Sequence, residues 1–379
     1  MKCLIFCFSF FSLLLLMLSC SSDNKHDCNQ VIVVNLDTVQ IQDVSLSNLY
    51  SEIEFIPMDN VEEALFGRVS SMDVSEKGII ILDKTSLPKI LQFDSCGKFI
   101  RNIGRIGNAR GEYQHNVTNI GYSNCGDTIF IVTFNGLLLY NKDGSFLSSK
   151  SLNDQVVVDF KAIPSGYVYS TRYFGANDYI LHFWNDKFEN VKEILPVDDY
   201  GIGDWGICID PLCISDSNLY YYNEYNSDIY KIDIHSMKLL KCIKLSSKHS
   251  LSLSRFTDEK NKEVYEEPID LIYSYMAHGD KLYGDFISHE NGNLMFELCT
   301  TNNEIKLYNI GNWHPNIKAN FGGYCYDVID QNEFLNISTV YDCEKSLREI
   351  DKCNYFDIKD SITEKSNFII VKTMLKYSK

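Results

Sequence analysis

The sequence predicts an all-β protein, a six-bladed β-propeller whose blades each contain four strands. The first observation is a strand–turn–strand segment: the apolar strand Ile90–Phe93, the turn Asp94-Ser95-Cys96-Gly97 and a second strand, Lys98–Ile103. The pattern recurs at Leu138–Leu147, which again places an aromatic residue before a turn that ends in glycine. The composition agrees, because the chain contains 24 tyrosines and 22 phenylalanines and its aliphatic runs are short. A strand pair that recurs in a chain of 379 residues predicts a repeat architecture.

The number of blades follows from the third strand of each blade. Residues near the ends of these strands are separated by 47, 43, 49, 64 and 74 positions. Three of these steps match the roughly 40 to 50 residues of a four-stranded propeller blade, and the other two contain insertions. The six third strands are expected at Ile90–Phe93, Leu137–Tyr140, Tyr179–Trp184, Asp228–Ile232, Leu294–Leu298 and Phe368–Val371.

The last blade lacks a fourth strand of its own, because the chain ends soon after Phe368–Thr373. Its inner strand is expected near Tyr324–Ile329 and its second strand at Phe334–Thr339. The spare N-terminal strand or strands, Val31–Val39 and Glu52–Met58, are expected to complete this blade and close the ring. Closure leaves only short outer edges exposed.

Two insertions interrupt the pattern. Ser246–Glu267 is polar and charged and lies between an outer strand and the next inner strand. Tyr341–Asn354 has a helical composition and is predicted to form a small helical insertion in the last blade. Cys343 and Cys353 flank this helix and are the one pair of cysteines that we would test for a disulfide, since the cysteine spacing is otherwise irregular.

The first twenty residues, MKCLIFCFSFFSLLLLMLSC, contain one lysine, an apolar run from Leu4 to Leu18, and Cys20. The run is too short for a membrane span and suits a secretory signal. A small residue before the cysteine and a polar stretch after it resemble a bacterial lipoprotein signal. The resemblance implies cleavage before Cys20, lipid attachment there and no cofactor. The alternatives are a plain secretory signal or an N-terminal membrane anchor. We divide the chain into a signal peptide (1–19), a lipidated tether (20–30) and the propeller (31–379).

The net charge of −16 excludes nucleic acid as a partner, because a polyanionic backbone would be repelled. The predicted partners are the membrane, reached through the lipid on Cys20, and a glycan, a peptide or another envelope protein. The expected location is the cell envelope, at the periplasmic or surface face of the outer membrane.

A family resemblance rests on two consecutive motifs. Phe93-Asp94-x-x-Gly97-Lys98-Phe99-Ile100 is followed by Gly104-Arg105-x-Gly107-x-x-x-Gly111-Glu112-Tyr113. Together they resemble the six-bladed β-propeller lipoproteins of Gram-negative bacteria, relatives of the NHL-repeat propellers. The loop of that family usually reads G-R-x-G-x-G-P-G-E-Y, and Asn108-Ala109-Arg110 replaces its central part here. The resemblance covers nearly the whole chain after the signal and implies fold and location, whereas propellers host many unrelated functions.

Candidate binding residues lie on loops at one mouth of the central channel. In the glycine-rich loop, Arg105, Arg110 and Glu112 either meet a ligand or pair with each other and hold the loop between blades. Aromatic side chains with polar edges suit stacking on sugars or capture of peptides, and they equally serve to pack loops onto the blades. The remaining candidates on the loops of this mouth are Tyr173, Trp205, His289, Trp313 and His314.

No local catalytic motif is present: the sequence lacks G-x-S-x-G, H-E-x-x-H, a phosphate-binding loop and an EF-hand pattern. The leading hypothesis is therefore a binding or scaffold propeller. The alternative is a metal-dependent enzyme of the lactonase or lyase type, as in related propellers, with calcium or zinc held in the channel by residues from several blades. A purely structural role in assembling other envelope proteins is a third possibility.

Overall fold

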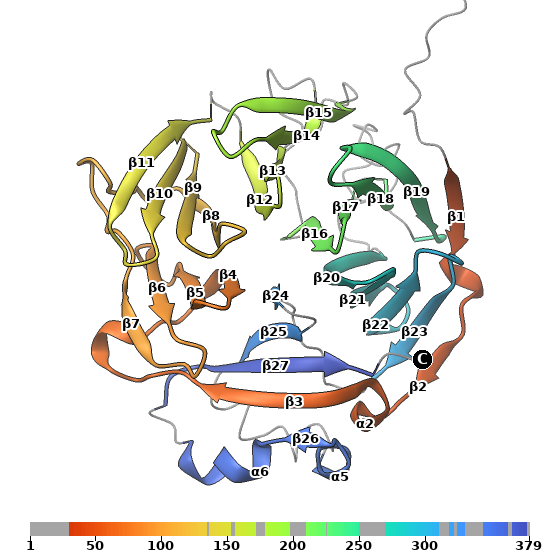
Figure 1. The fold of residues 1–379 in the computed structure, drawn as a ribbon. Coiled ribbons are helices and arrows are strands. Elements are labelled where there is room, and N and C mark those ends of the chain that lie inside the picture. Colours follow the sequence, from red (N-terminus) through yellow and green to blue (C-terminus); the bar gives the residue numbers. More distant parts are fainter. Residues whose placement is uncertain are drawn as a thin grey trace, which may run out of the picture.

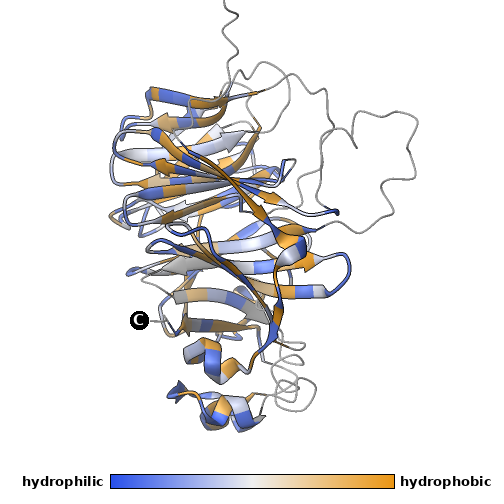
Figure 2. Cartoon of the chain, turned by 90° about the vertical axis from the view of Figure 1, so that its right-hand side faces the viewer, coloured by the Kyte–Doolittle hydropathy of each residue, from blue (hydrophilic) through white to orange (hydrophobic). Residues whose placement is uncertain are grey.

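A computed structural model shows six sheets arranged as a ring around a central channel, so the predicted six-bladed propeller is confirmed (Figure 1). The structure describes residues 30–376 apart from 135, 153–155, 172–178, 198–209, 225, 250–269, 311–317, 322–323, 330–343 and 363–365. Each blade has an inner strand beside the channel and three further strands that follow it outward by antiparallel pairing. The strands carry both hydrophobic and hydrophilic residues (Figure 2), and the second strands of blades 1 and 3, at Gly78–Asp83 and Gly166–Thr171, are buried along their whole length.

The first three blades each consist of four consecutive strands. Blade 1 contains β4 (Val69–Ser75), β5 (Gly78–Asp83), β6 (Lys89–Phe93) and β7 (Phe99–Asn102). Blade 2 contains β8 (Val117–Tyr122), β9 (Thr128–Thr133), β10 (Gly136–Asn141) and β11 (Phe146–Ser151). Blade 3 contains β12 (Val157–Ile163), β13 (Gly166–Thr171), β14 (Tyr179–Trp184) and β15 (Asn190–Pro196).

Blades 4 to 6 each carry a fifth strand on the outside. Blade 4 contains β16 (Leu212–Ser215), β17 (Asn218–Asn223), β18 (Asp228–Asp233) and β19 (Lys238–Ser246), with β1 (Val31–Asn35) outermost. Blade 5 contains β20 (Leu271–His278), β21 (Lys281–Ser288), β22 (Gly292–Cys299) and β23 (Ile305–Asn309), with β2 (Ile41–Asp43) outermost. Blade 6 contains β24 (Ala319–Phe321), β25 (Tyr324–Ile329), β27 (Ile369–Leu375) and β3 (Tyr50–Pro57), with β26 (Lys352–Cys353) outermost.

All six strands predicted as third strands occupy the third position of their blades: β6, β10, β14, β18, β22 and β27. The last blade differs from expectation in its inner part. Tyr324–Ile329 is the second strand, because it pairs directly with β27 and the short strand β24 lies inside it. Phe334–Thr339, expected as the second strand, lies outside the described residues.

The N-terminal chain closes the ring through one strand. β3 pairs antiparallel with β27, from Ile369 opposite Pro57 to Leu375 opposite Tyr50, and so supplies the missing fourth strand of blade 6. The prediction that Val31–Val39 belongs to that blade was wrong. Its strand β1 pairs in parallel with β19 of blade 4, where Val34 turns inward and is buried while Val31 and Val33 remain exposed. This placement covers the backbone edge of the nine-residue strand β19.

The helices are short and lie outside the sheets. The predicted helical insertion corresponds to α5 (Glu344–Arg348). The side chain of Leu347 in this helix is buried in the same apolar cluster as Phe55 of β3. Cys353 follows it as a free thiol, while its suggested partner Cys343 lies outside the described residues. Within the described residues, the other helical turns are α2 (Leu46–Leu49), α6 (Tyr355–Ile358) and three 3-10 turns at Leu36–Thr38, Glu62–Ala64 and Lys359–Ser361.

One carboxyl group is buried in the packing between blades 5 and 6. Asp285 of β21 is 8% exposed, and its Oδ2 accepts a hydrogen bond of 2.8 Å from the Ser274 hydroxyl. It borders a small void of about 10 Å³ together with Tyr50, Cys325 and Thr373. Burial raises the pKa of Asp285 to about 7, since desolvation disfavours the carboxylate more than the single hydrogen bond favours it.

Truncation from the N-terminus should distinguish the contribution of β3, which closes the ring, from that of β1 and β2, which cover outer strand edges. A chain that begins at residue 45 keeps β3 and is expected to fold, losing about 2 kcal/mol of unfolding free energy for each of the buried side chains Val34 and Leu36. A chain that begins at residue 59 lacks β3 and is expected not to fold cooperatively. Thermal unfolding followed by circular dichroism checks both, and a cooperative transition of the shorter chain near that of the longer one would contradict the role of β3.

Asp285→Asn should change how stability depends on pH. The folded-state pKa of Asp285 lies above its unfolded value of about 4. The contribution of Asp285 to the free energy of unfolding is therefore full below pH 4 and is lost as the pH rises through about 7. Asparagine keeps the acceptor for Ser274 and does not titrate. In urea unfolding, the difference in free energy of unfolding between the variant and the parent should therefore shift by about 2 to 4 kcal/mol in favour of the variant between pH 5 and pH 8. A pH-independent difference would contradict this assignment.

Candidate functional site

The described structure contains a cavity of about 320 Å³ in the central channel. All six blades contribute to it, through the inner strands β4, β8, β12, β16 and β20 and through Lys318 directly before β24. Its apolar lining is almost fully buried, whereas the polar lining residues retain exposed atoms. The polar lining residues are Asp73, Ser75, Ser123, Asn124, Lys161, Asp210 and Lys318.

A repeated bulge places polar side chains beside the channel. In four inner strands the pairing register shifts directly after a valine or isoleucine, at Val69, Val117, Val157 and Ile272. The residue that follows each shift is polar and at least nine-tenths buried: Ser71, Asn119, Asp159 and Ser274. Bulges re-aim side chains. Here Asn119 and Asp159 meet across blades 2 and 3, whereas Ser274 donates a hydrogen bond to Asp285 of its own blade.

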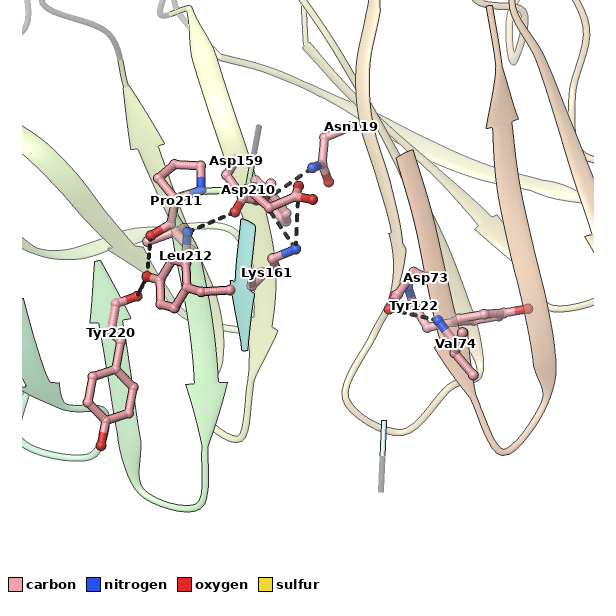
Figure 3. A network of polar contacts seen from close by, with 12 residues as sticks. Asp73, Val74, Asn119, Tyr122, Asp159, Lys161, Asp210, Pro211, Leu212 and Tyr220 are labelled. Atoms are coloured by element: carbon pink, nitrogen blue, oxygen red, sulfur yellow. Dashed lines mark hydrogen bonds and ion pairs between the residues drawn. The ribbon is translucent and has the colours of Figure 1, made fainter. Parts of the chain in front are cut away.

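Asp159 joins three blades through its carboxylate (Figure 3). Its Oδ1 accepts a hydrogen bond of 3.2 Å from Asn119 Nδ2 of blade 2, and its Oδ2 accepts one of 3.0 Å from the backbone N–H of Leu212 in blade 4. Its side chain is fully buried, so these bonds replace the water that the carboxylate loses.

Lys161, two residues further along β12, reaches the same carboxylate. Its Nζ lies 3.3 Å from Asp159 Oδ1 and 4.0 Å from Asp210 Oδ1. Burial by itself would lower the pKa of Lys161, but the carboxylates of Asp159 and Asp210 outweigh burial and raise it above the usual range. Lys161 is therefore a permanent cation at neutral pH and unsuited to act as a nucleophile.

Two of the channel carboxyl groups titrate above their usual range. Burial raises the pKa of Asp159 to about 6, although Lys161 opposes this rise. Burial also raises the pKa of Asp73 to about 6, opposed first by the backbone N–H of Tyr122, which donates to Asp73 Oδ2 at 2.7 Å. Figure 3 shows Asp73 and Tyr122 apart from the group around Lys161. The bond links blade 1 to blade 2, so Asp73, like Asp159, fixes neighbouring inner strands.

Among the charged lining residues, Lys161 and Asp210 lie close together and are both partly exposed. About one third of the Lys161 side chain and one fifth of the Asp210 side chain remain exposed, at 33% and 21%. Together they present an ammonium donor and a carboxylate acceptor about 4 Å apart in a partly desolvated space. Charged hydrogen-bonding groups of both kinds suit hydroxyl, amide or terminal charged groups of a small polar ligand.

The glycine-rich loop after β7 is held by its own residues. Arg105 Nε lies 2.6 Å from Glu112 Oε1, and Glu112 Oε2 accepts a hydrogen bond of 2.9 Å from the backbone N–H of Ala109. A Cβ at Gly107 would lie 1.9 Å from Glu112 Oε2, so a side chain there would displace this carboxylate from its present position. The Arg105 side chain is 81% exposed, so this ion pair lies at the protein surface.

Arg110 lies over the ring of Phe146, with its guanidinium carbon 5.7 Å from the ring centroid. Gly111 has a φ of +80°, and its carbonyl accepts a hydrogen bond of 2.7 Å from the Tyr140 hydroxyl of blade 2. The contacts of Arg105, Arg110 and Glu112 thus hold the loop between blades 1 and 2, which is one of the two roles predicted for them.

His289 is placed by the turn between β21 and β22. Its backbone N–H donates to Asp270 Oδ1 at 2.7 Å, and its ring lies 4.1 Å from the ring of His249. It does not line the channel cavity. The other predicted residues lie outside the described residues: Cys20, Tyr173, Trp205, Trp313 and His314.

Prediction from the sequence missed Asp73, Asp159, Lys161 and Asp210. One signal was available: each of the four bulged inner strands has, at its first or second position, a valine or isoleucine followed two positions later by serine, asparagine or aspartate. The pairing of these residues across blades had no local signal, because Asp159 and Asp210 are 51 positions apart in the chain.

The described residues do not fit a metal site. They contain no group of three histidine, cysteine, aspartate or glutamate side chains close enough to hold a metal ion. In the channel, the oxygens of Asp73 and Asp159 are already engaged by backbone N–H groups, Asn119 or Lys161. We therefore derive no reaction step through calcium or zinc.

Within the described part of the chain, no helix is both long and apolar enough to cross a membrane.

Comparison with known proteins identifies a family and two similar folds. The model of a family described as Domain of unknown function (DUF4934) matches residues 30–373. A crystal structure of a "putative exported protein" from Bacteroides fragilis is similar, with a TM-score of 0.70 at 15% identity, covering 92% of this chain and 100% of that one. A member of the DUF4221 family from Bacteroides vulgatus has a TM-score of 0.52 at 11% identity, covering 86% and 97%. Among curated proteins, none matches the sequence.

Lys161→Met should destabilise the fold in a pH-dependent way. Without the ammonium, Asp159 is a buried carboxylate with no cation beside it, so its pKa rises further above 6 and its ionisation opposes folding. We expect a loss of about 3 kcal/mol in urea unfolding at pH 8 and a clearly smaller loss at pH 5, where Asp159 is protonated. Lys238→Met, on the exposed side of β19, is the control, and an equal loss at both pH values would contradict the pairing.

Proposed function

The chain belongs to the family described as Domain of unknown function (DUF4934), and we propose that it is an exported, membrane-tethered propeller that binds a small polar ligand in its central channel. The ligand class that we assign is the end of a glycan or of a peptide. The observation that carries the proposal is the cavity of about 320 Å³ in which Lys161 and Asp210 are both partly exposed.

The polarity of the cavity supports this ligand class. Its apolar walls, such as Phe160 and Tyr275, are 0% and 5% exposed and belong to the core, so the accessible surface is mainly polar. Sugar hydroxyls and peptide termini offer both donors and acceptors, which match a carboxylate and an ammonium ion about 4 Å apart. An apolar ligand would leave both charged groups desolvated without partners.

The location rests on the leader and on the similar fold from Bacteroides fragilis, which is described as exported. In our proposal the leader 1–19 is removed and Cys20 carries the lipid, so the propeller is tethered to an envelope membrane by residues 20–30. A plain secretory signal would give the same fold without the anchor. Incorporation of labelled palmitate, lost in Cys20→Ser, distinguishes the two.

The loops at the mouth extend the site in this proposal. A glycan or peptide longer than the cavity would leave the channel past residues that we assign as outer contacts. These are Arg105, Arg110, Glu112, Tyr173, Trp205, His289, Trp313 and His314. A partner envelope protein would bind in the same way by inserting one end of its chain into the channel.

Asp210→Asn is the sharpest test of the channel site. The exchange preserves size but removes the charge, and we expect at least a fivefold loss of affinity, since a hydrogen bond to a charged group contributes about 1.5 to 3 kcal/mol. Calorimetric titration of glycan and peptide libraries identifies the ligand first, in buffers with and without chelator. Trp205→Ala and Trp313→Ala then report on the mouth.

Lys238→Met, far from the channel on β19, serves as the matched control and should bind as the parent does. Affinity unchanged in Asp210→Asn but lost in the tryptophan variants would move the site to the mouth. Binding that requires calcium or zinc would instead favour the metal-dependent enzyme.

A further inference from the structure

A second pocket lies on the outer rim, where the end of β11 meets blade 3. Its volume is about 540 Å³, and it is separate from the channel because the two share no lining residue. Figure 1 shows the end of β11 next to the beginning of β15. The lining residues are Lys150, Ser151, Leu152, Tyr169, Trp184, Phe188, Glu189, Asn190 and Glu193.

Aromatic side chains form the inner wall of this rim pocket. The rings of Tyr169 and Trp184 meet edge to face at 4.9 Å, and Phe188 lies 6.3 Å from Trp184. Tyr169 and Trp184 are 2% and 7% exposed, and the ring of Tyr169 is stacked on Phe160 and on His182, so these two rings contribute little accessible surface. Phe188 is half-buried and supplies the accessible aromatic surface of the pocket, and aromatic rings attract cations.

Two glutamates stand beside this wall. Glu193 Oε1 lies 3.1 Å from His182 Nδ1, while His182 Nε2 lies 3.0 Å from the carbonyl oxygen of Tyr179. Burial lowers the pKa of His182, although Glu193 opposes this, so the imidazole covers Glu193 without neutralising its charge. Only one third of the Glu193 side chain remains exposed.

Glu189 differs from Glu193 in this respect. It is exposed and accepts a hydrogen bond of 2.8 Å from Asn185 Nδ2, and among the described residues no cation pairs with it. Lys150, on the opposite side of the pocket, forms no ion pair with either glutamate in the described structure. The pocket therefore combines the half-buried ring of Phe188 with the carboxylates of Glu189 and Glu193, a combination that suits an ammonium or guanidinium group.

The strand edge beside the pocket offers a way to bind a peptide. In blades 4 and 5 the outermost strand of the blade is extended in parallel by β1 and β2, so this fold accepts strand addition on its rim. Within the described residues, no strand pairs with the outer edge of β11. Lys150 and Ser151 of β11 also line the rim pocket, so the edge leads directly into it.

We propose that the rim of blades 2 and 3 binds an extended segment of a partner protein that carries a basic side chain. The backbone of the segment pairs with the edge of β11, and its lysine or arginine enters the rim pocket between the aromatic wall and Glu189. The net charge of −16 favours the approach of a basic segment. This interaction is independent of the ligand proposed for the channel.

Calorimetry with the full chain lacking its leader tests the proposal. The probe is the peptide acetyl-Val-Thr-Lys-Thr-Val-amide, compared with the same peptide containing norleucine in place of lysine and with a peptide N-methylated at alternate residues. We expect millimolar or tighter binding of the first peptide, about tenfold weaker binding of the norleucine peptide and loss of binding on N-methylation.

Glu189→Gln should weaken binding of the lysine peptide about two- to fivefold, as expected for an exposed charge pair, while the norleucine peptide is unaffected. Glu76→Gln, at the exposed turn between β4 and β5, is the matched control. No binding of the lysine peptide, equal binding of the norleucine peptide, or no effect of Glu189→Gln each overturns the pocket assignment. Undiminished binding of the N-methylated peptide overturns strand pairing.

Discussion

The fold depends on the pairing of β3 with β27. This antiparallel pair joins residues 50–57 to residues 369–375 and is the only link in the described structure that completes blade 6 with a strand from the other end of the chain. The ion pair between Lys372 Nζ and Glu54 Oε2, at 2.8 Å, lies across the same two strands. Without this pair the ring would have a blade of three strands and an exposed long edge. The circular arrangement of inner strands, and hence the channel, follows from closure.

Closure of the ring creates the channel. The shape of the channel in turn explains why polar side chains line it. Six inner strands around one axis leave a space that their side chains do not fill, and polar groups facing this space need partners. Asp73 and Asp159 find them in the backbone N–H groups of Tyr122 and Leu212 on the next blades. Lys161 compensates the charge of Asp159. The same residues therefore hold neighbouring blades together and leave Lys161 and Asp210 partly exposed, so stability and the binding that we propose share one network.

The sequence was sufficient for the repeat but not for contacts between repeats. The third strand of every blade was predictable because each combines local apolar alternation with a turn, and β3 was predictable because the last blade lacked a strand. The prediction placed Val31–Asn35 in blade 6, whereas it pairs with β19 of blade 4. A strand that belongs to no blade of its own can pair with any open edge, and the sequence does not distinguish the edge of β19 from that of blade 6. Asp159, Lys161 and Asp210 could not be assigned for a related reason. Asp159 and Lys161 pair within one strand, but their contacts with Asp210 and with the neighbouring blades depend on the rotation between sheets and not on spacing along the chain.

The entry point of the tether connects these features. β1 begins at Val31 on the outer edge of blade 4, at the rim and away from the channel axis (Figure 1). If Cys20 carries the lipid, about ten residues separate the membrane from the rim, which allows at most about 35 Å. A tether attached at the rim does not force either mouth of the channel against the membrane. It also places β1 and β2 over the edges of blades 4 and 5, while β11 of blade 2 has no such cover in the described structure. The N-terminal segment thus covers the edges of blades 4 and 5, and among the described strands it leaves the outer edges of β7, β11 and β15 without an added strand.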